Sequence, residues 1–190
     1  ETTKGMNIGL DIGLFNNRIA FTADFYRNST NDMLYQIDIP NGTGFSAIQE
    51  NIGEFRFWGY EFGASIQNMM GAFKWRTDIN VSFNRNKVIK LGTNNTPLDG
   101  ISELGGTGYW KTAVGNPIGL FYGYVFDGIY MTQEEFDKQP KHITSRIGTV
   151  RYKDLDNSGV IDQLDRTYIG NPNPKFIFGI NNAFSYKNWD

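Results

Sequence analysis

An acidic segment at residues 154–165 carries the clearest chemical signal in the chain, because oxygen-bearing groups recur there at the spacing of a twelve-residue calcium-binding loop. The groups that would offer oxygen belong to Asp154, Asp156, Ser158, Val160, Asp162 and Asp165. Val160 would contribute its backbone carbonyl, and Gly159 stands where the loop turns sharply. Asp165 replaces the usual bidentate Glu, so its shorter side chain lowers the expected affinity. The segment predicts a calcium site without long flanking helices; the alternative is an acidic turn in solvent.

The remaining candidate catalytic groups do not combine into an active site. His142 is the only histidine, so neither a catalytic triad nor a two-histidine metal site can be built, and we expect an exposed loop histidine. Residues 105–108 are rich in glycine but lack the Lys-Ser/Thr that follows a phosphate-binding loop, which favours a flexible loop. The pair Glu134-Glu135 is explained by charge at a helix start. We therefore expect no enzymatic activity.

A second group of candidate binding residues is aromatic. Flat aromatic rings can stack on the apolar faces of sugar rings, which makes exposed loop aromatics candidate substrate contacts. The candidates here are Tyr109, Trp110, Tyr122 and Tyr124. The alternative is that each of them packs within a loop or belongs to an aromatic belt.

Composition excludes several classes of protein. The chain has 190 residues, a net charge of −2 and no cysteine, so it lacks the basic excess that nucleic-acid binding requires and has no disulfide or thiolate zinc site. No stretch approaches the roughly 20 apolar residues of a membrane-spanning helix. Short alternating strands of a transmembrane β-barrel remain compatible with the same composition, because their mean hydropathy is low.

Alternation of apolar and polar residues predicts an all-β, antiparallel fold. The expected strands cover residues 6–13, 18–27, 56–66, 73–83 and 175–186. One short helix is expected at 133–138, where Thr132 and Glu135 form a capping-box pattern. We expect residues 28–55 to form a loop with one extended piece at 33–39, and residues 87–174 to form a very long loop region.

The connections between these strands alternate between short and long. Short turns are expected at about 15–17 and 67–72, and another at Lys187-Asn188, whereas 28–55 and 87–174 are long. Outer-membrane barrels have this arrangement, with short periplasmic turns and long extracellular loops. Aromatic residues also gather beside the short turns, where an interfacial girdle would lie. The alternative is an antiparallel sheet with one solvated face in a soluble protein.

The polar strand faces favour a water-filled lumen. Lys74, Arg76, Asp78 and Asn80 share one face of a strand, and Asn7 and Asp11 share one face of another. Five long strands cannot close a barrel of useful bore, since even barrels filled by side chains have about eight strands. We therefore expect the chain to be part of a larger barrel, and we expect it not to fold alone because its strand edges and apolar band would be exposed.

Several sequence blocks resemble a known family in their order and spacing. They include Asn16-Asn17-Arg18, Gly59-Tyr60-Glu61, Ser82-Phe83-Asn84-Arg85-Asn86-Lys87-Val88, Gly119-Leu120-Phe121-Tyr122-Gly123-Tyr124 and Ile169-Gly170-Asn171-Pro172-Asn173-Pro174. Together they resemble the C-terminal half of SusC/RagA-type TonB-linked outer-membrane proteins of Bacteroidetes, over nearly all of residues 1–190. The stretch from Asp154 to Arg166 is similar to the acidic loop of that family, although a more typical calcium loop has Asp at position 158.

The resemblance implies an antiparallel transmembrane segment of a 22-stranded barrel in outer-membrane lipid, with 87–174 as a long extracellular loop region. It also implies an N-terminal plug and a TonB-contacting segment outside these residues, and a SusD-like surface lipoprotein. The transported substrate would be a glycan or a peptide, moved without a covalent step. Two other functions are weighed against this one. They are a secreted, calcium-stabilised β-sandwich that binds carbohydrate, and an enzyme whose acid or base lies outside these residues.

Overall fold

The computed structural model describes residues 1–38, 47–92, 94–100 and 109–190. The chain separates into two compact units, which are described one at a time. The first, here called the sheet unit, comprises Glu1–Thr96, Ala113–Pro117 and Asn173–Asp190. The second, here called the loop unit, comprises Pro97–Thr112 and Ile118–Pro172.

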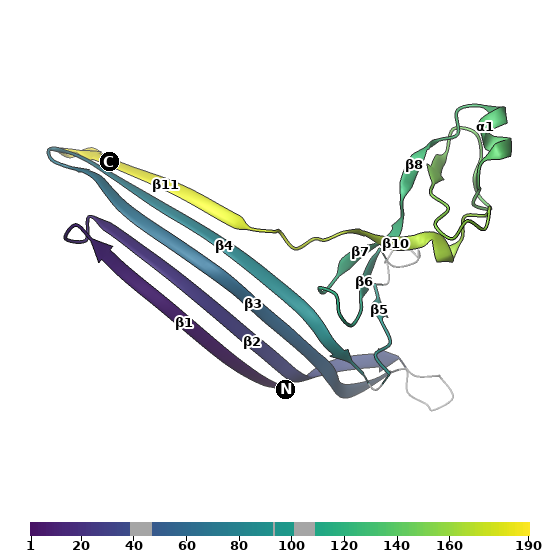
Figure 1. Cartoon of the computed structure of the whole chain (residues 1–190), viewed down its shortest axis with the longest axis horizontal. Coiled ribbons are helices and arrows are strands. Elements are labelled where there is room, and N and C mark those ends of the chain that lie inside the picture. The colour runs from purple at the N-terminus through teal and green to yellow at the C-terminus, as the bar shows by residue number, and fades with distance from the viewer. Residues whose placement is uncertain (39–46, 93, 101–108) are drawn as a thin grey trace. The chain divides into compact units, whose positions relative to one another are not determined.

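The described part of the sheet unit is one five-stranded antiparallel sheet (Figure 1). Its strands lie in the order β1-β2-β3-β4-β11. Their bounds are Thr2–Leu14 for β1, Ile19–Asp38 for β2, Ala47–Met70 for β3, Phe73–Leu91 for β4 and Ile177–Tyr186 for β11. This arrangement confirms the predicted all-β, antiparallel class and each of the five expected strands.

The strand register places the apolar residues of all five strands on one face. Leu10, Ala23, Phe62, Val81 and Phe178 form one row across the sheet, each directly opposite the next. The neighbouring row runs from Ile12 to Ile180 in the same way. Many of these side chains are exposed: Ile8 is 61% exposed and Phe178 65% exposed. An apolar face that the described chain leaves open is what contact with lipid requires.

The opposite face of the sheet is polar, and glycines on it leave room for neighbouring side chains. Asp11, Thr22, Gly63 and Asn80 share one row, and the next row contains Ser65 and Asp78. Several glycines lie opposite polar side chains that fold over them. A Cβ on Gly63 would stand 2.5 Å from Thr22 Oγ1, and one on Gly9 2.6 Å from Asp24 Oδ1. The missing glycine side chains thus let their polar neighbours lie flat against the sheet.

The strands are longer than the sequence predicts, and the expected loop at 28–55 is wrong over most of its length. β2 continues to Asp38 and β3 begins at Ala47, while β4 continues past residue 83 to Leu91. The predicted extended piece at 33–39 is part of β2 as far as Asp38, and residues 39–46 lie outside the described residues. A strand of 24 residues, such as β3, is about 80 Å long and extends well beyond the membrane core. Outside the membrane both faces can be polar, so the alternation is lost although the strand continues.

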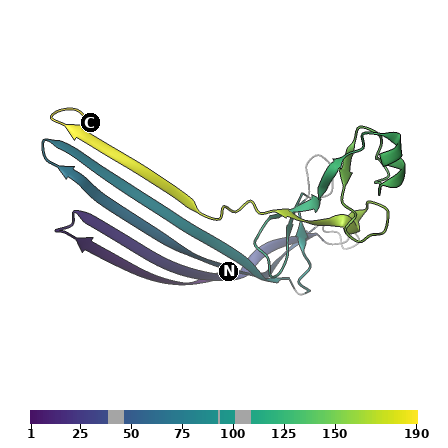
Figure 2. The same cartoon turned by 45° about the horizontal axis from the view of Figure 1, so that its top comes forward.

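Short turns join the strands at one end of the sheet, as both views show (Figures 1 and 2). Residues 15–18 connect β1 to β2, and 71–72 connect β3 to β4. Phe15, Asn16 and Asn17 all have positive φ values, which asparagine tolerates better than most residues. Arg18 links the two turns, because its guanidinium donates to the carbonyls of Gln67 (3.0 Å) and Asn68 (2.8 Å). A further turn at 187–188 follows β11, where one was predicted.

Aromatic side chains gather beside these turns. The rings of Phe73 and Trp75 stack on Phe184 with centroids 6.1 and 5.8 Å apart, and Phe73 is directly opposite Tyr186. Such a band is typical of the level at which a barrel wall meets the membrane interface. At the other end of the sheet Phe55, Val88 and Leu91 are buried. The segment 113–117 covers β4 there, through bonds from the Val88 amide to the Asn116 carbonyl and from the Gly115 amide to the Val88 carbonyl, each 2.9 Å.

In the loop unit, the described residues form two small antiparallel sheets and a short helix. One sheet has the order β10-β7-β6-β5, and β8 pairs with β9 in the other. The bounds are Leu98–Asp99 (β5), Trp110–Thr112 (β6), Leu120–Tyr124 (β7), Phe126–Ile129 (β8), Val150–Tyr152 (β9) and Arg166–Gly170 (β10). The region predicted as a long loop therefore contains much short, regular structure. Tyr130 and Ile161 are the most deeply buried hydrophobic side chains among its described residues.

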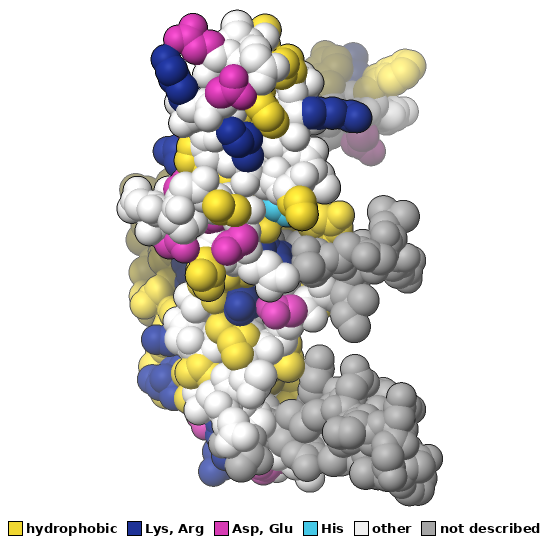
Figure 3. Space-filling model, turned by 90° about the vertical axis from the view of Figure 1, so that its right-hand side faces the viewer, with side chains coloured by type: hydrophobic (Ala, Val, Ile, Leu, Met, Phe, Trp, Pro, Cys, Tyr) yellow, Lys and Arg dark blue, Asp and Glu magenta, His cyan; other side chains and the backbone are white. Residues whose placement is uncertain are grey.

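The helix α1 (Gln133–Lys138) begins and ends where the capping pattern predicts. The Thr132 side chain accepts a bond from the Glu135 amide, and the Glu135 carboxylate accepts one from the Met131 amide, 2.9 Å long. No helix among the described residues is long and apolar enough to cross a membrane. On the face shown in Figure 3, hydrophobic side chains lie interspersed with charged ones.

Candidate functional site

The acidic loop folds around its first aspartate. The Asp154 carboxylate accepts bonds from the amides of Ser158 (3.1 Å) and Gly159 (2.8 Å). Asn157 and Gly159 have positive φ values of 61° and 82°, which turn the chain sharply enough to point these amides inward. The Asp156 carboxylate accepts a second bond from the Ser158 amide at 2.9 Å. Hydrogen bonding by Ser158 is the main reason that the pKa of Asp156 lies below its usual value.

Asp165 is completely buried and closes the loop. Its two carboxylate oxygens accept from the amides of Leu155 (2.7 Å) and Asp162 (2.8 Å). Asp154, Asp156 and Asp165 each offer an oxygen such that the three oxygens lie within 4.8 Å of one another. The folded loop thus brings together the first, third and twelfth positions of the predicted calcium loop.

The other three predicted ligands have different partners. Asp162 caps the 3₁₀ turn η2 (Gln163–Asp165), accepting from the Leu164 amide at 2.7 Å. The Ser158 hydroxyl donates to the Val160 carbonyl at 2.9 Å. These groups would have to exchange their present bonds for contact with a cation.

The second candidate site is an aromatic cavity of about 390 Å³ in the loop unit. Three of the four predicted aromatics, Tyr109, Tyr122 and Tyr124, line it. Trp110 is not among the lining residues; its indole lies against Gly100, where an added Cβ would come within 2.0 Å of Nε1. The cavity is completed by Phe121, Gly123, Tyr152, Arg166 and Ile169.

Cations and rings hold the tyrosines in place. Lys111 Nζ lies 4.4 Å and Arg166 Cζ 4.9 Å from the centre of the Tyr122 ring, which is the geometry of cation–π contacts. Tyr124 packs on Tyr152 with ring centroids 5.0 Å apart. Burial is the largest cause that raises the pKa of Tyr124, so its hydroxyl stays protonated at neutral pH.

Sequence reasoning did not identify Phe121, Tyr152 and Arg166 as members of this cavity. β7 pairs with β10 so that Tyr124 lies opposite Arg166 and Tyr122 opposite Tyr168. This pairing joins residues more than forty positions apart, and no local pattern encodes it. The periodic placement of Tyr122 and Tyr124 on one face of a strand was the only readable signal.

The other motifs have structural roles or fall outside the description. His142 is half-buried rather than exposed as predicted, and its ring lies 2.8 Å from the Thr144 hydroxyl and beside the Tyr124 ring. Glu134 pairs with Lys138 on α1 at 2.7 Å. The glycine-rich residues 105–108 lie outside the described residues.

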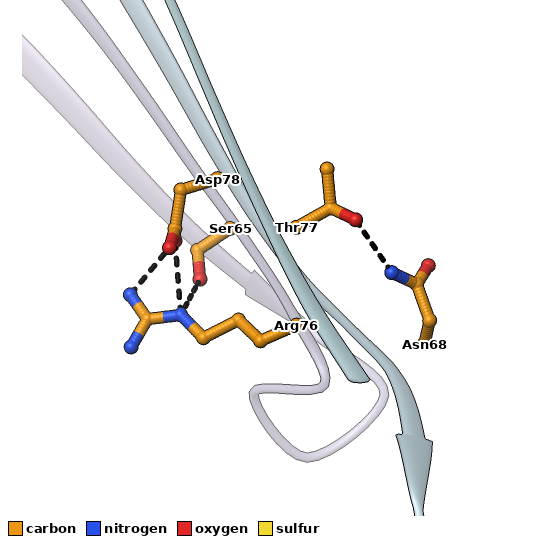
Figure 4. A network of polar contacts seen from close by, with 5 residues as sticks. All are labelled: Ser65, Asn68, Arg76, Thr77 and Asp78. Atoms are coloured by element: carbon orange, nitrogen blue, oxygen red, sulfur yellow. Dashed lines mark hydrogen bonds and ion pairs between the residues drawn. The ribbon is translucent and has the colours of Figure 1, made fainter. Parts of the chain in front are cut away.

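Polar networks also mark both faces of the sheet near the short turns (Figure 4). On the polar face, Arg76 bonds to Asp78 at 2.7 Å and to Ser65 at 3.2 Å. On the apolar face, the Asn68 amide donates to the Thr77 hydroxyl at 2.7 Å. Thr77 in turn donates to Asn182 at 2.7 Å, and the Trp75 indole donates to the same Asn182 oxygen at 3.0 Å. The asparagine that interrupts the apolar face thus gives interfacial side chains a partner.

Comparison with known proteins decides the family. A family model described as "TonB dependent receptor-like, beta-barrel" matches residues 1–187. The chain belongs to this family. It is 34% identical over 191 residues to TonB-dependent receptor P26 of Formosa agariphila, covering 100% of this chain and 19% of that protein. It is 30% identical over 195 residues to TonB-dependent receptor SusC of Bacteroides thetaiotaomicron, covering 100% of this chain and 18% of SusC.

Solved structures show the same fold. The chain matches the structure of the RagAB peptide transporter with a TM-score of 0.73 and 22% identity, over 97% of this chain and 19% of that one. A second RagAB structure, of the peptide importer in the open-open state, matches with a TM-score of 0.71 and 21% identity, over 96% of this chain and 19% of that one. The chain thus spans about a fifth of the length of its relatives.

Family membership places the chain in the outer membrane as a segment of a TonB-dependent receptor barrel. The matched relatives are named as receptors and transporters, not as enzymes. The alternative of a secreted β-sandwich requires a second sheet on the apolar face. Within the described residues that face is exposed, and we set this alternative aside.

Proposed function

We propose that this chain forms part of the wall and the extracellular loops of a transporter that imports a glycan or a peptide together with a SusD-like lipoprotein. The observation that carries the proposal is the match to a SusC receptor over the whole chain. The two-faced sheet supports it, because its apolar rows suit lipid and its polar face suits a water-filled passage. Energy would come from the TonB complex, acting through segments outside residues 1–190.

Substrate recognition would lie in the loop unit. That unit holds the aromatic cavity, and exposed aromatic rings there can hold a ligand without covalent chemistry. Transport then needs only differential binding, in which the loops and the lipoprotein hold the ligand and energy-coupled movement releases it. We accordingly propose no catalytic role for the chain.

Purification of the full-length parent from native membranes in mild detergent tests this function. We expect it in the outer-membrane fraction with a surface lipoprotein that co-purifies in equal amount. Deletion of the parent should abolish uptake of one class of oligosaccharide or peptide. A parent that has no lipoprotein partner, and whose loss changes the uptake of neither class, would contradict the proposal.

We also propose that Ca²⁺ binds the acidic loop and stabilises the loop unit. The clustered oxygens of Asp154, Asp156 and Asp165 support this proposal. We expect Ca²⁺ to raise the melting temperature of the full-length receptor relative to EDTA-treated protein, and the paired change Asp154→Asn and Asp156→Asn to remove that increase. Asp137→Asn, on the exposed surface of α1, is the matched control. If Ca²⁺ raised the melting temperature equally in the paired variant and in the unmodified receptor, the site would be refuted.

A further inference from the structure

The aromatic cavity of the loop unit is biased toward positive charge. Among its described lining residues, Arg166 is the one charged side chain, and no carboxylate lines the wall. Lys111 adds a second cation against the Tyr122 ring, with Asp99 as an ion-pair partner 3.7 Å away at a solvent-exposed position. A cavity with low-polarity walls and a cation at its side attracts an anionic ligand.

Arg166 has partners within the chain, since its guanidinium donates to the Tyr122 carbonyl at 3.4 Å. The acidic groups nearest to it in sequence bond within the acidic loop. Both oxygens of Asp165 accept backbone amides, and Asp162 caps η2. Besides burial, the charges of Asp162 and Asp165 raise the pKa of Tyr124, whereas the charge of Arg166 lowers it. The described acids therefore lower the positive potential of the cavity without contributing a carboxylate to its lining.

Two aromatic surfaces of the cavity remain open to a ligand. Tyr109 is 62% exposed and Phe121 47% exposed. The Tyr122 ring, in contrast, is contacted by two cations and by the edge of Tyr168 at 5.5 Å between centroids. A flat ligand would stack on Tyr109 or Phe121, while Tyr122 positions the cations.

The cavity suits a single ring better than an extended chain. Its volume of about 390 Å³ lies near the lower end for small-ligand sites. β7, which supplies half of the described lining, is paired with β6 on one edge and β10 on the other. It therefore offers no open ladder to which an extended peptide could add as a strand. The protonated Tyr124 hydroxyl adds a hydrogen-bond donor.

We infer that this cavity binds a carboxylate-bearing sugar ring, a uronate residue of an acidic glycan. Arg166 would face the carboxylate, and Tyr109 and Phe121 would contact the apolar face of the ring. Charge-assisted bonds between guanidinium and carboxylate are among the stronger polar contacts and add directional selectivity. The inference rests on the proposed import function and names the substrate class for it.

Calorimetric titration of the full-length receptor with its lipoprotein tests the inference. The probes are trigalacturonate, its methyl ester, neutral galactotriose and a glutamate-rich peptide. We expect trigalacturonate to bind at least tenfold more tightly than the ester, which has the same ring shape without the charge. Arg166→Gln should weaken trigalacturonate binding about tenfold and leave galactotriose unchanged, while Arg166→Lys should retain part of the affinity. Tyr109→Ala should weaken the binding of both sugars.

Arg146→Gln is the matched control, because Arg146 is an exposed arginine of the same unit. This variant should bind the probes as tightly as the unmodified receptor. Outer-membrane abundance of each variant checks that it is assembled. Equal binding of acid and ester, unchanged binding in Arg166→Gln, or binding of the peptide alone would each overturn the inference. None of these outcomes would contradict the proposed import function. That function is contradicted only if the full-length protein has no lipoprotein partner and its deletion changes the uptake of neither oligosaccharides nor peptides.

Discussion

At the residue scale, we expect Asp165 to be sensitive even to a conservative substitution. It is buried, and each carboxylate oxygen accepts one backbone amide. Asp165→Asn replaces one acceptor by an NH₂ group that faces an N–H donor, so a buried hydrogen bond is lost at a cost of about 1–3 kcal/mol. We expect hydrogen exchange at the Leu155 or Asp162 amide of the full-length receptor to become at least tenfold faster. Asp137→Asn should leave both amides unchanged, and equal protection in Asp165→Asn would show that the carboxylate is dispensable.

Asp156 predicts how the loop responds to acid. Its pKa is lowered in the folded loop, chiefly by hydrogen bonding to Ser158. Because the folded pKa is below the unfolded value of about 3.9, the stabilisation is fully present above that value and is lost as the pH falls through the folded pKa. Amide exchange at Ser158, corrected for its intrinsic pH dependence and measured in EDTA, should therefore stay constant from neutral pH to about pH 5 and rise only in stronger acid. A rise near neutral pH would contradict this assignment.

At the scale of elements, the sheet depends on glycines that accept neighbouring side chains. A Cβ on Gly63 meets only the Thr22 side chain, whereas a Cβ on Gly59 meets the Phe83 backbone carbonyl at 2.7 Å as well as the Tyr26 ring. Gly63→Ala should therefore cost about 1 kcal/mol and be rescued by Thr22→Ala. Gly59→Ala should cost about 2–3 kcal/mol and not be rescued by Tyr26→Ala, since the carbonyl remains.

Urea unfolding of the full-length receptor in detergent measures these differences, and the two double variants serve as controls for each other. Rescue of Gly59→Ala by Tyr26→Ala would show that the backbone contact is not limiting. Gly59 and Gly63 are compared because both lie on the polar face of β3, where the side chain of the residue opposite on β2 packs against each glycine.

The same elements show what the sequence could and could not predict. Residues 73–83 were readable because lipid on one face and water on the other impose strict alternation. Residues 84–91 continue the strand without that contrast. The predicted strand therefore ends at residue 83 and the predicted loop begins at residue 87, although the strand pairs with β3 as far as Leu91. The helix at 133–138 was readable from its cap, which acts locally. Only three of the eight lining residues of the cavity were predicted. Arg166 was missed because it reaches Tyr122 through strand pairing across a long sequence separation.

At the scale of the whole molecule, the apolar rows and the open edges predict how the isolated chain behaves. Leu10, Phe62 and Phe178 lie in one exposed row. Among the described residues, β1 and β11 each pair on one edge only, which leaves two unpaired strand edges. Exposed edges and apolar faces together drive association in water. We therefore expect residues 1–190, diluted from urea into buffer, to form large aggregates.

Sedimentation analysis with and without detergent measures this association. Detergent covers the apolar face but leaves the strand edges unpaired, so it should reduce the aggregates to small oligomers rather than to monomers. Adding charge to the face, for example by Leu10→Lys and Phe178→Lys, should improve solubility without detergent while preventing insertion of the full-length parent, since a cation near the membrane midplane costs about 2–4 kcal/mol. A stable soluble monomer of the unmodified chain would mean that its apolar rows find cover within the chain itself. Lipid would then not be needed to explain why one face of the sheet is apolar from β1 to β11.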